Sequence, residues 1–433
     1  MIPDAGEMMA WIRAVTERGI RRPGYPADDW TAAWAAARFE EFGLEGVRLA
    51  PVELPCWKPV SATLAVEGGP EFEAFALPYT RAKARVRAPL SREVAPGAIV
   101  VPEMAFTELP QAYLRDLATA WHDPEGAFDE LTQVLPFQLD YLDVLHGAMR
   151  GGAAGFAGGL TGVPWETRDY YAPYDAETRD IPAVWLSGRD ARRVLALIDE
   201  GPRTGVLTVE AETGPAVSHN VIGVLPGASD QWVIIGSHHD APWASAVEDA
   251  TGIALVLAAA RHWASVPARE RPHNLLFLLT AGHMALAAGT RAFIEENRAM
   301  LPDVVLQLHL EHAALRCEGV DGELVPTGDP EPRWWFTSRR PRLERLVHEA
   351  LVAEDLRRSF VLPPDVFSPM PPTDGAFFHP EGVPLVHFLS APMYLFDSAD
   401  TLDKVDVAGL EPLARAAVRI VEGTAGWTAR DPS

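Results

Sequence analysis

The stretch Trp232–Thr251, with the sequence WVIIGSHHDAPWASAVEDAT, indicates which fold this chain adopts. It opens with a short apolar run rich in β-branched residues, Val233–Ile235, which stops at Gly236. A run of this kind, bounded by glycine and polar residues, is typical of a central strand in a covered, mostly parallel sheet. In such sheets, ligands bind in the crevice at the carboxyl ends of the strands. The stretch therefore predicts an α/β fold with a polar site just after this strand.

Five polar side chains follow that strand and precede the next predicted helix. They are His238, His239, Asp240, Glu248 and Asp249. Imidazole and carboxylate groups gathered at a strand end are common ligands of a transition metal. We therefore expect a metal site in this loop.

The chain from residue 220 onward alternates strand and helix patterns. The apolar periodicity predicts strands at 221–224, 232–235, 274–279, 304–310 and 385–389, and helices at 252–264, 287–297, 342–356 and 407–422. Such alternation indicates βαβ units. The expected fold class is α/β, with a mixed, mostly parallel sheet covered by helices on both faces.

The first half of the chain has a less regular pattern. We expect helices at 5–18, 28–42 and 187–200, strands at 47–52, 60–66, 97–101, 181–186 and 206–211, and a helical segment over 104–150. The glycine-dense residues 151–162 suit either a flexible linker or a tight turn between a strand and a helix.

A chain of 433 residues is too long for one ordinary core. We therefore predict that residues 1–59 join the main domain, that residues 60–204 form a smaller inserted α/β domain, and that residues 205–433 form the catalytic domain.

The net charge of −23 argues against nucleic-acid binding, because a phosphate backbone requires a basic face. It also argues against docking on anionic membranes. No apolar run reaches the roughly 20 residues of a membrane helix, and the first residues lack the basic region of a signal peptide. We expect a cytoplasmic protein. Cys56 and Cys317 are too few and too far apart to predict a disulfide framework.

Two further predicted strands end in residues of the same chemical type. His283 follows the strand 274–279, and the strand 304–310 leads into Glu311 and His312. Because side chains alternate along a strand, His309 and Glu311 share one face and His312 lies on the other. A buried carboxylate needs a partner. We expect these residues to share one site with the loop after residue 236.

Four stretches resemble motifs of the M28 family of zinc aminopeptidases, in the family's order. GSHHDAPWASAVEDATG is similar to the metal-binding G-x-H-x-D and G-A-x-D-N-x-S-G motifs, and LLFLLTAGHMALAAGTRAF to F-x-x-x-x-x-E-E-x-G-x-x-G-S-x-x-F. TDGAFFHPEGVPLVHF resembles S-D-x-x-x-F-x-x-x-G-I-P, and YLFDSADTLDKVD resembles Y-H-T-x-x-D-T-x-D. The stretches GAMRGGAAGFAGG and DIPAVWLSGRDARRVLALIDEG are similar to the protease-associated domain that is often inserted in these enzymes.

The resemblance implies a role for several residues. Family members bind two zinc ions. His238 matches the first histidine ligand, Asp240 the acid that orients it, and Glu248 the bridging aspartate, one methylene longer. Glu311 matches the second acid. One zinc ion could therefore be held by His238, Glu248 and Glu311.

The other half of the family's site is altered in this chain. His283 stands where the family has its general-base glutamate, Met284 where it has a zinc-binding glutamate, and Phe396 where it has the final histidine. A thioether and a phenyl ring cannot replace these ligands. We therefore expect a rewired, mononuclear site.

Two interpretations of this altered site remain open. In the first, the protein is a metallohydrolase in which His283 acts as acid–base or as a ligand, with Asp240 as orienter. His239, His309 or His312 would complete the ligand set or support it. In the second, the chain is a non-catalytic binding protein on a peptidase fold. A metal-dependent cyclase or transferase is a further alternative.

The first interpretation is our prediction, with one divalent metal ion, zinc first and iron, copper or nickel as alternatives. The expected substrate is a small peptide or amide-containing molecule, and no nucleic acid or membrane partner is expected. The segment 104–150 could form a lid or a dimer surface, which leaves a homodimer open.

Overall fold

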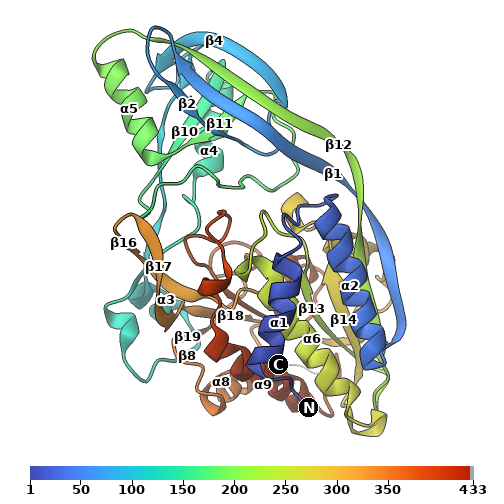
Figure 1. The fold of residues 1–433 in the computed structure, drawn as a ribbon. Coiled ribbons are helices and arrows are strands. Elements are labelled where there is room, and N and C mark those ends of the chain that lie inside the picture. The colour runs from blue at the N-terminus through green and yellow to red at the C-terminus, as the bar shows by residue number, and fades with distance from the viewer. Residues whose placement is uncertain (430–433) are drawn as a thin grey trace.

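The computed structural model describes residues 1–429, which form a large domain and a smaller lobe connected by two long strands (Figure 1). The large domain contains a mixed sheet with the predicted α/β architecture. Its strands lie in the order β12 (Thr204–Leu225), β14 (Asn274–Thr280), β13 (Trp232–His238), β15 (Val304–Leu310), β20 (Leu385–Ser390), β18 (Arg333–Thr337), β19 (Ser359–Leu362) and β8 (Ala120–His122).

The centre of this sheet is parallel. Strand β13 pairs in parallel with β14 and β15, and β15 pairs in parallel with β20. The carboxyl ends of these four strands therefore meet at one edge. The predicted site residues follow β13, β14 and β15 at that edge.

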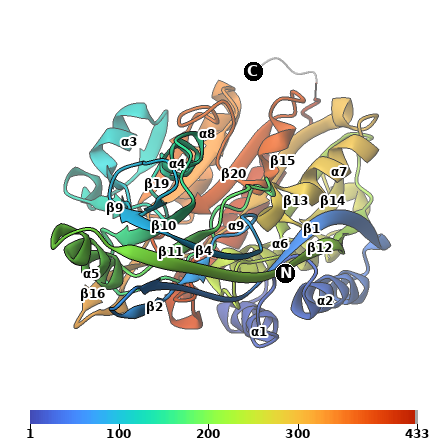
Figure 2. The same cartoon turned by 90° about the horizontal axis from the view of Figure 1, so that it is seen from above.

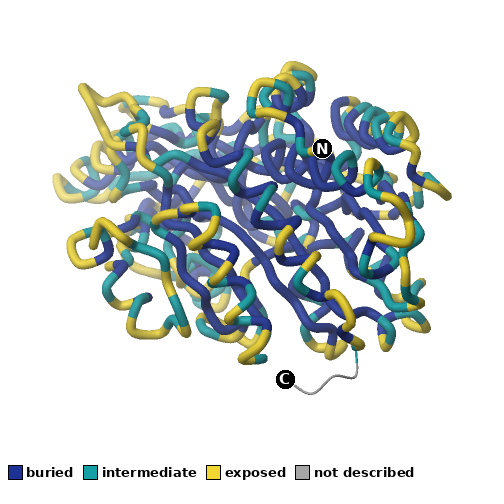
Figure 3. Tube along the Cα trace, turned by 90° about the horizontal axis from the view of Figure 1, so that it is seen from below, coloured by how far each residue is buried: buried dark blue, intermediate teal, exposed yellow. Residues whose placement is uncertain are grey.

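Side chains of the central strands alternate between two apolar layers. Val233 and Ile235 belong to the main core on one face, and Ile234 belongs to a second cluster on the other face. The main core includes α6 (Gly252–Ala264), and α1 (Ala5–Thr16), α2 (Pro26–Phe42) and α9 (Val407–Gly423) pack against this helix. Helix α8 (Pro341–Ala353) packs against α9. The second cluster includes residues of α7 (Ala288–Glu296). Burial on both faces explains the continuous apolar runs of these strands, and Figure 3 shows the buried segments at the centre of the molecule.

The smaller lobe is built on strands in the order β3 (Phe75–Ala76), β11 (Ala183–Leu186), β10 (Gly155–Thr161), β5 (Ile99–Val100) and β4 (Lys83–Ser91), and β6 (Glu103–Ala105) also pairs with β10. Helix α5 (Gly188–Asp199) packs on β10, and its first turn is capped by Ser187, whose side chain accepts a hydrogen bond from the amide of Asp190.

Strands β1 (Glu45–Val66) and β12 run from the large domain into the smaller lobe and pair antiparallel along their length (Figures 1 and 2). The predicted pairs of strands at 47–52 and 60–66, and at 206–211 and 221–224, are thus single continuous strands. The middle of β12 is a run of exposed residues, 212–215, and Pro55 and Pro59 interrupt β1, so the apolar pattern is broken in both strands. The predicted boundary at residue 60 falls within β1, and the boundary at 204 falls at the first residue of β12.

The prediction of a helical segment over 104–150 is wrong for most of its length. Only α3 (Gln111–Leu117) and α4 (Tyr141–Arg150) are α-helical, and β6 (Glu103–Ala105), β7 (Glu108–Pro110), β8 and β9 (Thr132–Val134) lie around them. Pro110, Pro124 and Pro136 interrupt the segment, and proline inside a helix removes a hydrogen bond and clashes with the preceding turn.

Most of the glycine-dense stretch is a strand, β10, and its first residues form the turn that follows α4. A Cβ atom on Gly158 would lie 2.5 Å from the ring of Trp185, and one on Gly159 would lie 2.2 Å from the Cβ of Ala191. Glycine is required here because α5 and the neighbouring strand approach the backbone closely.

The predicted elements from residue 232 onward are confirmed within a few residues at each end. Helix α6 and strand β15 have the predicted bounds. Among the described residues, no helix is long and apolar enough to cross a membrane.

Candidate metal centre

His238 is the last residue of β13 and is completely buried. Its Nδ1 lies 3.0 Å from the backbone carbonyl oxygen of Asp240, which fixes the ring and leaves Nε2 free. Burial, together with the neighbouring imidazoles of His283 and His312, holds the pKa of His238 well below its usual value. The ring is therefore neutral, which is the form that binds a metal.

Glu248 stands in the irregular turn Val247–Thr251 that precedes α6. The carboxylate of Asp400 accepts hydrogen bonds from the amides of Ala246, Val247 and Glu248, at 3.1, 2.8 and 2.8 Å. Three amides bound to one buried carboxylate fix this turn, and so fix where the Glu248 side chain begins.

His312 reaches the same place from the end of β15. Its backbone has a φ of 49°, in the left-handed region, so the chain turns sharply after the strand. Its Nδ1 lies 2.9 Å from the carbonyl oxygen of Ser390, and its Nε2 lies 2.5 Å from Oε2 of Glu248. Burial opposes protonation, but the charge of Glu248 and the contact with it raise the pKa of His312 to about 9.

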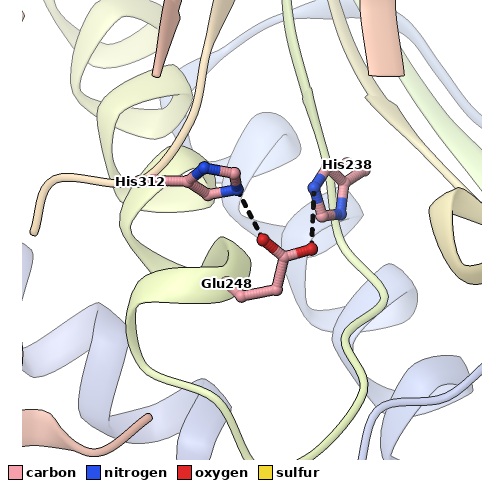
Figure 4. A group of neighbouring side chains, drawn as sticks. All are labelled: His238, Glu248 and His312. Carbon is pink, nitrogen blue, oxygen red and sulfur yellow. Dashed lines mark ion pairs between the residues drawn. The ribbon is translucent and has the colours of Figure 1, made fainter. Parts of the chain in front are cut away.

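His238, Glu248 and His312 form one compact group, which we call the ligand cluster (Figure 4). One ligand atom from each lies within 4.8 Å of the others, and the Glu248 carboxylate stands between the two rings, with Oε1 3.6 Å from Nε2 of His238. Among residues 1–429, these are the side chains that come together as a group of three potential ligands.

The ligand cluster fits a bound metal ion because its buried polar atoms have no partners except the ion pairs among the site residues themselves. Nε2 of His238, Nε2 of His312 and both carboxylate oxygens of Glu248 are buried without a hydrogen bond of good geometry. A buried polar atom left unpaired is costly. Two imidazole nitrogens and a carboxylate are a common set of protein ligands for catalytic zinc.

Glu311 borders the ligand cluster. Its Oε1 lies 2.7 Å from Nε2 of His309 and accepts a hydrogen bond of 3.1 Å from the amide of Asp374. Its Oε2 has no hydrogen bond and lies 3.8 Å from Nε2 of His312. One carboxylate oxygen is thus anchored and the other faces the cluster. His309 itself contacts Glu311 and Gln307 and lies outside the cluster.

His239 does not join the other histidines. Its Nδ1 lies 3.1 Å from Oδ1 of Asp28 on α2, and its Nε2 lies 2.9 Å from the carbonyl oxygen of His219. Both ring nitrogens are therefore directed away from the ligand cluster.

His283 lies directly beside the ligand cluster, at the carboxyl end of β14. Its ring stacks on that of His238, with centroids 4.1 Å apart, and its Nε2 lies 3.5 Å from Oε1 of Glu248. Its Nδ1 lies 3.3 Å from Oδ1 of Asp374. Burial opposes protonation, but Asp374 and Glu248 raise the pKa of His283 to about 10. Its side chain is 11% exposed, whereas those of His238 and Glu248 are fully buried.

Asp240 holds this arrangement at two points. Its carbonyl oxygen orients His238, and its carboxylate oxygens accept hydrogen bonds of 2.9 Å from the amides of His283 and Met284. Burial raises the pKa of Asp240 to about 6. The carboxylate thus connects the loop after β13 to the loop after β14.

Sequence reasoning missed Asp374 and Asp400 as site residues. Asp374 begins the turn Asp374–Phe378, and its carboxylate contacts the hydroxyls of Thr280 and Thr290 in addition to His283. Both aspartates lie within stretches whose resemblance to family motifs was visible, TDGAFF and YLFDSAD. Only the folded chain brings them from over 90 residues away to His283 and Glu248.

The two apolar replacements pack into the core beside the site. Met284 is fully buried, and its carbonyl oxygen accepts a hydrogen bond of 2.7 Å from the hydroxyl of Tyr79. The ring of Phe396 lies 4.9 Å from that of Tyr174, which in turn lies 5.3 Å from the ring of His283.

A segment of the smaller lobe, residues 170–174, lies across this region and connects two loops of the large domain. The amide of Tyr171 donates to the carbonyl of Phe396, and the carbonyl of Tyr174 accepts from the amide of Leu286, both at 2.9 Å. We call residues 170–174 the covering segment.

Parts of this chain resemble known peptidases in sequence, and nearly the whole chain resembles them in structure. Residues 220–421 match the family model for peptidase family M28. A 138-residue region is 32% identical to a probable glutamate carboxypeptidase of Arabidopsis thaliana; it covers 28% of this chain and 20% of that protein. The matched region therefore spans about a fifth of the length of that relative.

Solved structures resemble nearly the whole chain. A peptidase M28 precursor from Shewanella amazonensis matches with a TM-score of 0.72 at 19% identity, over 98% of this chain and 95% of that one. An aminopeptidase from Aneurinibacillus sp. strain AM-1 matches with 0.66 at 19% identity, over 99% and 95%. The zinc aminopeptidase BSAP from Bacillus subtilis matches with 0.69 at 14% identity, over 96% and 95%. These likenesses confirm the fold, and residues 220–421 match the model of peptidase family M28.

Proposed function

We propose that this protein is a metal-dependent hydrolase with a mononuclear site, acting on a peptide or on a small molecule with an amide bond. The observation that carries the proposal is the convergence of buried nitrogen and oxygen atoms from His238, Glu248 and His312, whose only partners are other residues of the site. The match of residues 220–421 to a peptidase family supports the reaction class, and the ligand chemistry supports zinc.

The ligands would be His238, Glu248 and His312, with Glu311 next to them. The sequence predicts His238, Glu248 and Glu311 as ligands, with His239, His309 or His312 to complete the set, and of these last three His312 lies in the ligand cluster. Zinc in such a site would activate a water molecule and polarise the scissile carbonyl. Met284 and Phe396 offer no ligand for a second ion, which supports one metal per chain.

His283 would move the proton. Its Nε2 faces the ligand cluster, and Asp374 at Nδ1 holds the orientation of the ring. Because its pKa is raised to about 10, the ring carries a proton that it could deliver to the leaving amine as a general acid. As the partly exposed member of the group, His283 also lies on the side from which a substrate would arrive.

The substrate would be small. The ligand cluster is buried, and the covering segment of the smaller lobe places Tyr174 against His283. A short peptide or a compact amide fits such an enclosed site better than a folded protein. The smaller lobe, as a protease-associated-like domain over residues 60–204, would then contribute to substrate selection.

Elemental mass spectrometry of the purified protein tests the metal site. We expect about one zinc ion per chain in the native protein, lost in Glu248→Gln and in His312→Ala. His273→Gln is the matched control, because His273 is equally buried but contacts the carbonyl of Thr424 outside the cluster. Two ions per chain would contradict the mononuclear site, and no metal in the native protein would contradict the metalloenzyme.

Activity is tested with short peptides and aminoacyl anilides on the zinc-loaded protein. Turnover that a chelator removes and zinc restores is the expected result. One bound zinc ion with no turnover of either substrate class would favour the non-catalytic binding protein instead.

A further inference from the structure

Arg21, in the turn between α1 and α2, is an arginine with no exposed surface. Its backbone pairs with the loop after β13: the Arg21 amide donates to the carbonyl of Trp243 at 3.2 Å, and its carbonyl accepts from the amide of Ala241 at 3.0 Å. Fully buried arginines are rare unless their charge and donors are satisfied. The N-terminal turn is thus attached to the loop that leads from His238 to Glu248.

The guanidinium of Arg21 binds this loop from within. Its Nη2 donates to the carbonyls of Ser245 and Glu248, at 2.8 and 3.2 Å, and its Nε donates to the carbonyl of His239 at 3.3 Å. One rigid, planar group therefore contacts both ends of the loop 239–248, next to the two ligands His238 and Glu248.

The acceptors of Arg21 are neutral carbonyls, so its charge acts on acids farther away. Four acids stabilise the positive charge of the guanidinium. They are Asp400, Asp249, Asp240 and Glu248. Asp400 also holds the amide of Glu248. A positive charge fixed among these acids lowers the cost of keeping several carboxylates buried together.

We infer that Arg21 is a positioning residue of the metal centre. It sets the separation of His238 and Glu248 by holding the loop between them at both ends, and its charge offsets the surrounding carboxylates. This inference rests on the proposed metal-dependent function, and it assigns to the N-terminal turn a role in metal affinity.

The experiment compares zinc affinity and the Co²⁺ absorption spectrum of the whole chain with those of Arg21→Gln and Arg21→Lys. Arg271→Gln is the matched control, because the Arg271 side chain is also buried and also binds two backbone carbonyls, those of Trp263 and Pro226, far from the loop. Competition with a chromogenic chelator gives the affinity, and circular dichroism reports the fold.

Arg21→Gln should weaken zinc binding by about tenfold to a hundredfold, the range found for residues that support metal ligands. Its Co²⁺ spectrum should change because the ligand geometry relaxes. Arg21→Lys keeps the positive charge but lacks the planar guanidinium with its several N–H donors. Its zinc affinity should lie between those of Arg21→Gln and the native protein. Added guanidinium ion should partly restore affinity in Arg21→Ala. Arg271→Gln should lose stability but keep the zinc affinity and the Co²⁺ spectrum of the native protein.

Native affinity and an unchanged Co²⁺ spectrum in Arg21→Gln would overturn the inference, as would an equal loss of affinity in Arg271→Gln. If Arg21→Gln does not fold, Arg21→Lys decides, and native affinity in that variant overturns the positioning role. A native protein that binds no zinc would defeat the proposed function, and the inference with it. The other outcomes defeat the inference alone.

Discussion

The imidazole rings of His283 and His238 are stacked, with centroids 4.1 Å apart and planes inclined by 16°. His238 is the last residue of β13, and His283 lies just after the end of β14. The stack therefore joins the ends of two adjacent parallel strands. The ring of His283 is the partly exposed one, and its Nδ1 contacts the carboxylate of Asp374. In the function that we propose, this pair of side chains would separate a metal ligand, His238, from a proton-transfer group, His283.

Replacing His283 tests that separation. We expect His283→Gln to retain about one zinc ion per chain while kcat falls by roughly a hundredfold to ten-thousandfold, the usual contribution of a general acid–base. Steady-state kinetics and elemental analysis of the same sample provide the measurement. Loss of zinc together with activity would make His283 a ligand instead.

Replacing Asp400 tests how the turn at Glu248 is held. In Asp400→Asn, an amide NH₂ would face backbone amides that now bind a carboxylate oxygen. We expect the free energy of unfolding to fall by about 1–3 kcal/mol, as for other buried groups left unpaired, and zinc affinity to fall with it. Urea unfolding with and without zinc measures both. The exchange Asp230→Asn, at an exposed carboxylate, should change neither.

The pH dependence of stability should depend on Glu331, a buried carboxyl distant from the ligand cluster. Burial raises its pKa from 4.5 to about 7 in the folded protein, against the opposing charge of Arg316. Between those pH values the folded state binds more protons than the unfolded state, so stability falls as pH rises. Above about pH 7, the free energy of unfolding is lower than at acidic pH by roughly 3 kcal/mol because of this group.

Glu331→Gln should remove this loss. The variant should gain stability relative to the native protein as pH rises through this range, with no difference at the acidic end. Urea unfolding at a series of pH values measures the effect. A difference that does not vary with pH would show that Glu331 has an ordinary pKa.

Glycine in β10 is expected to be indispensable. In Gly158→Ala, the new methyl would lie 2.5 Å from the ring of Trp185, which predicts a loss of about 1–3 kcal/mol from overpacking. Gly147→Ala in α4 is the control. No atom stands within 4 Å of a Cβ there, and alanine is the better helix former by about 1 kcal/mol. Thermal unfolding of both variants should show opposite shifts, and equal shifts would contradict the close packing.

The sequence alone determined the alternating strands and helices of the large domain, because burial of an element imposes a local period on its apolar residues. Helix α6 and strand β15 have the predicted bounds for this reason. The sequence also indicated that His238, Glu248, His283 and Glu311 lie at one edge, since the carboxyl ends of parallel strands meet there.

The tertiary structure alone decided which of these groups face one another. His312 was expected on the opposite face of its strand from Glu311, and it turns to the Glu248 carboxylate because its backbone adopts a positive φ after the strand ends. Asp374, Asp400 and Arg21 contact the site from distant parts of the chain. The continuous pairing of β1 with β12 is likewise a long-range contact. Such contacts leave no local period in the sequence, since they depend on the packing of segments that only the completed fold brings together.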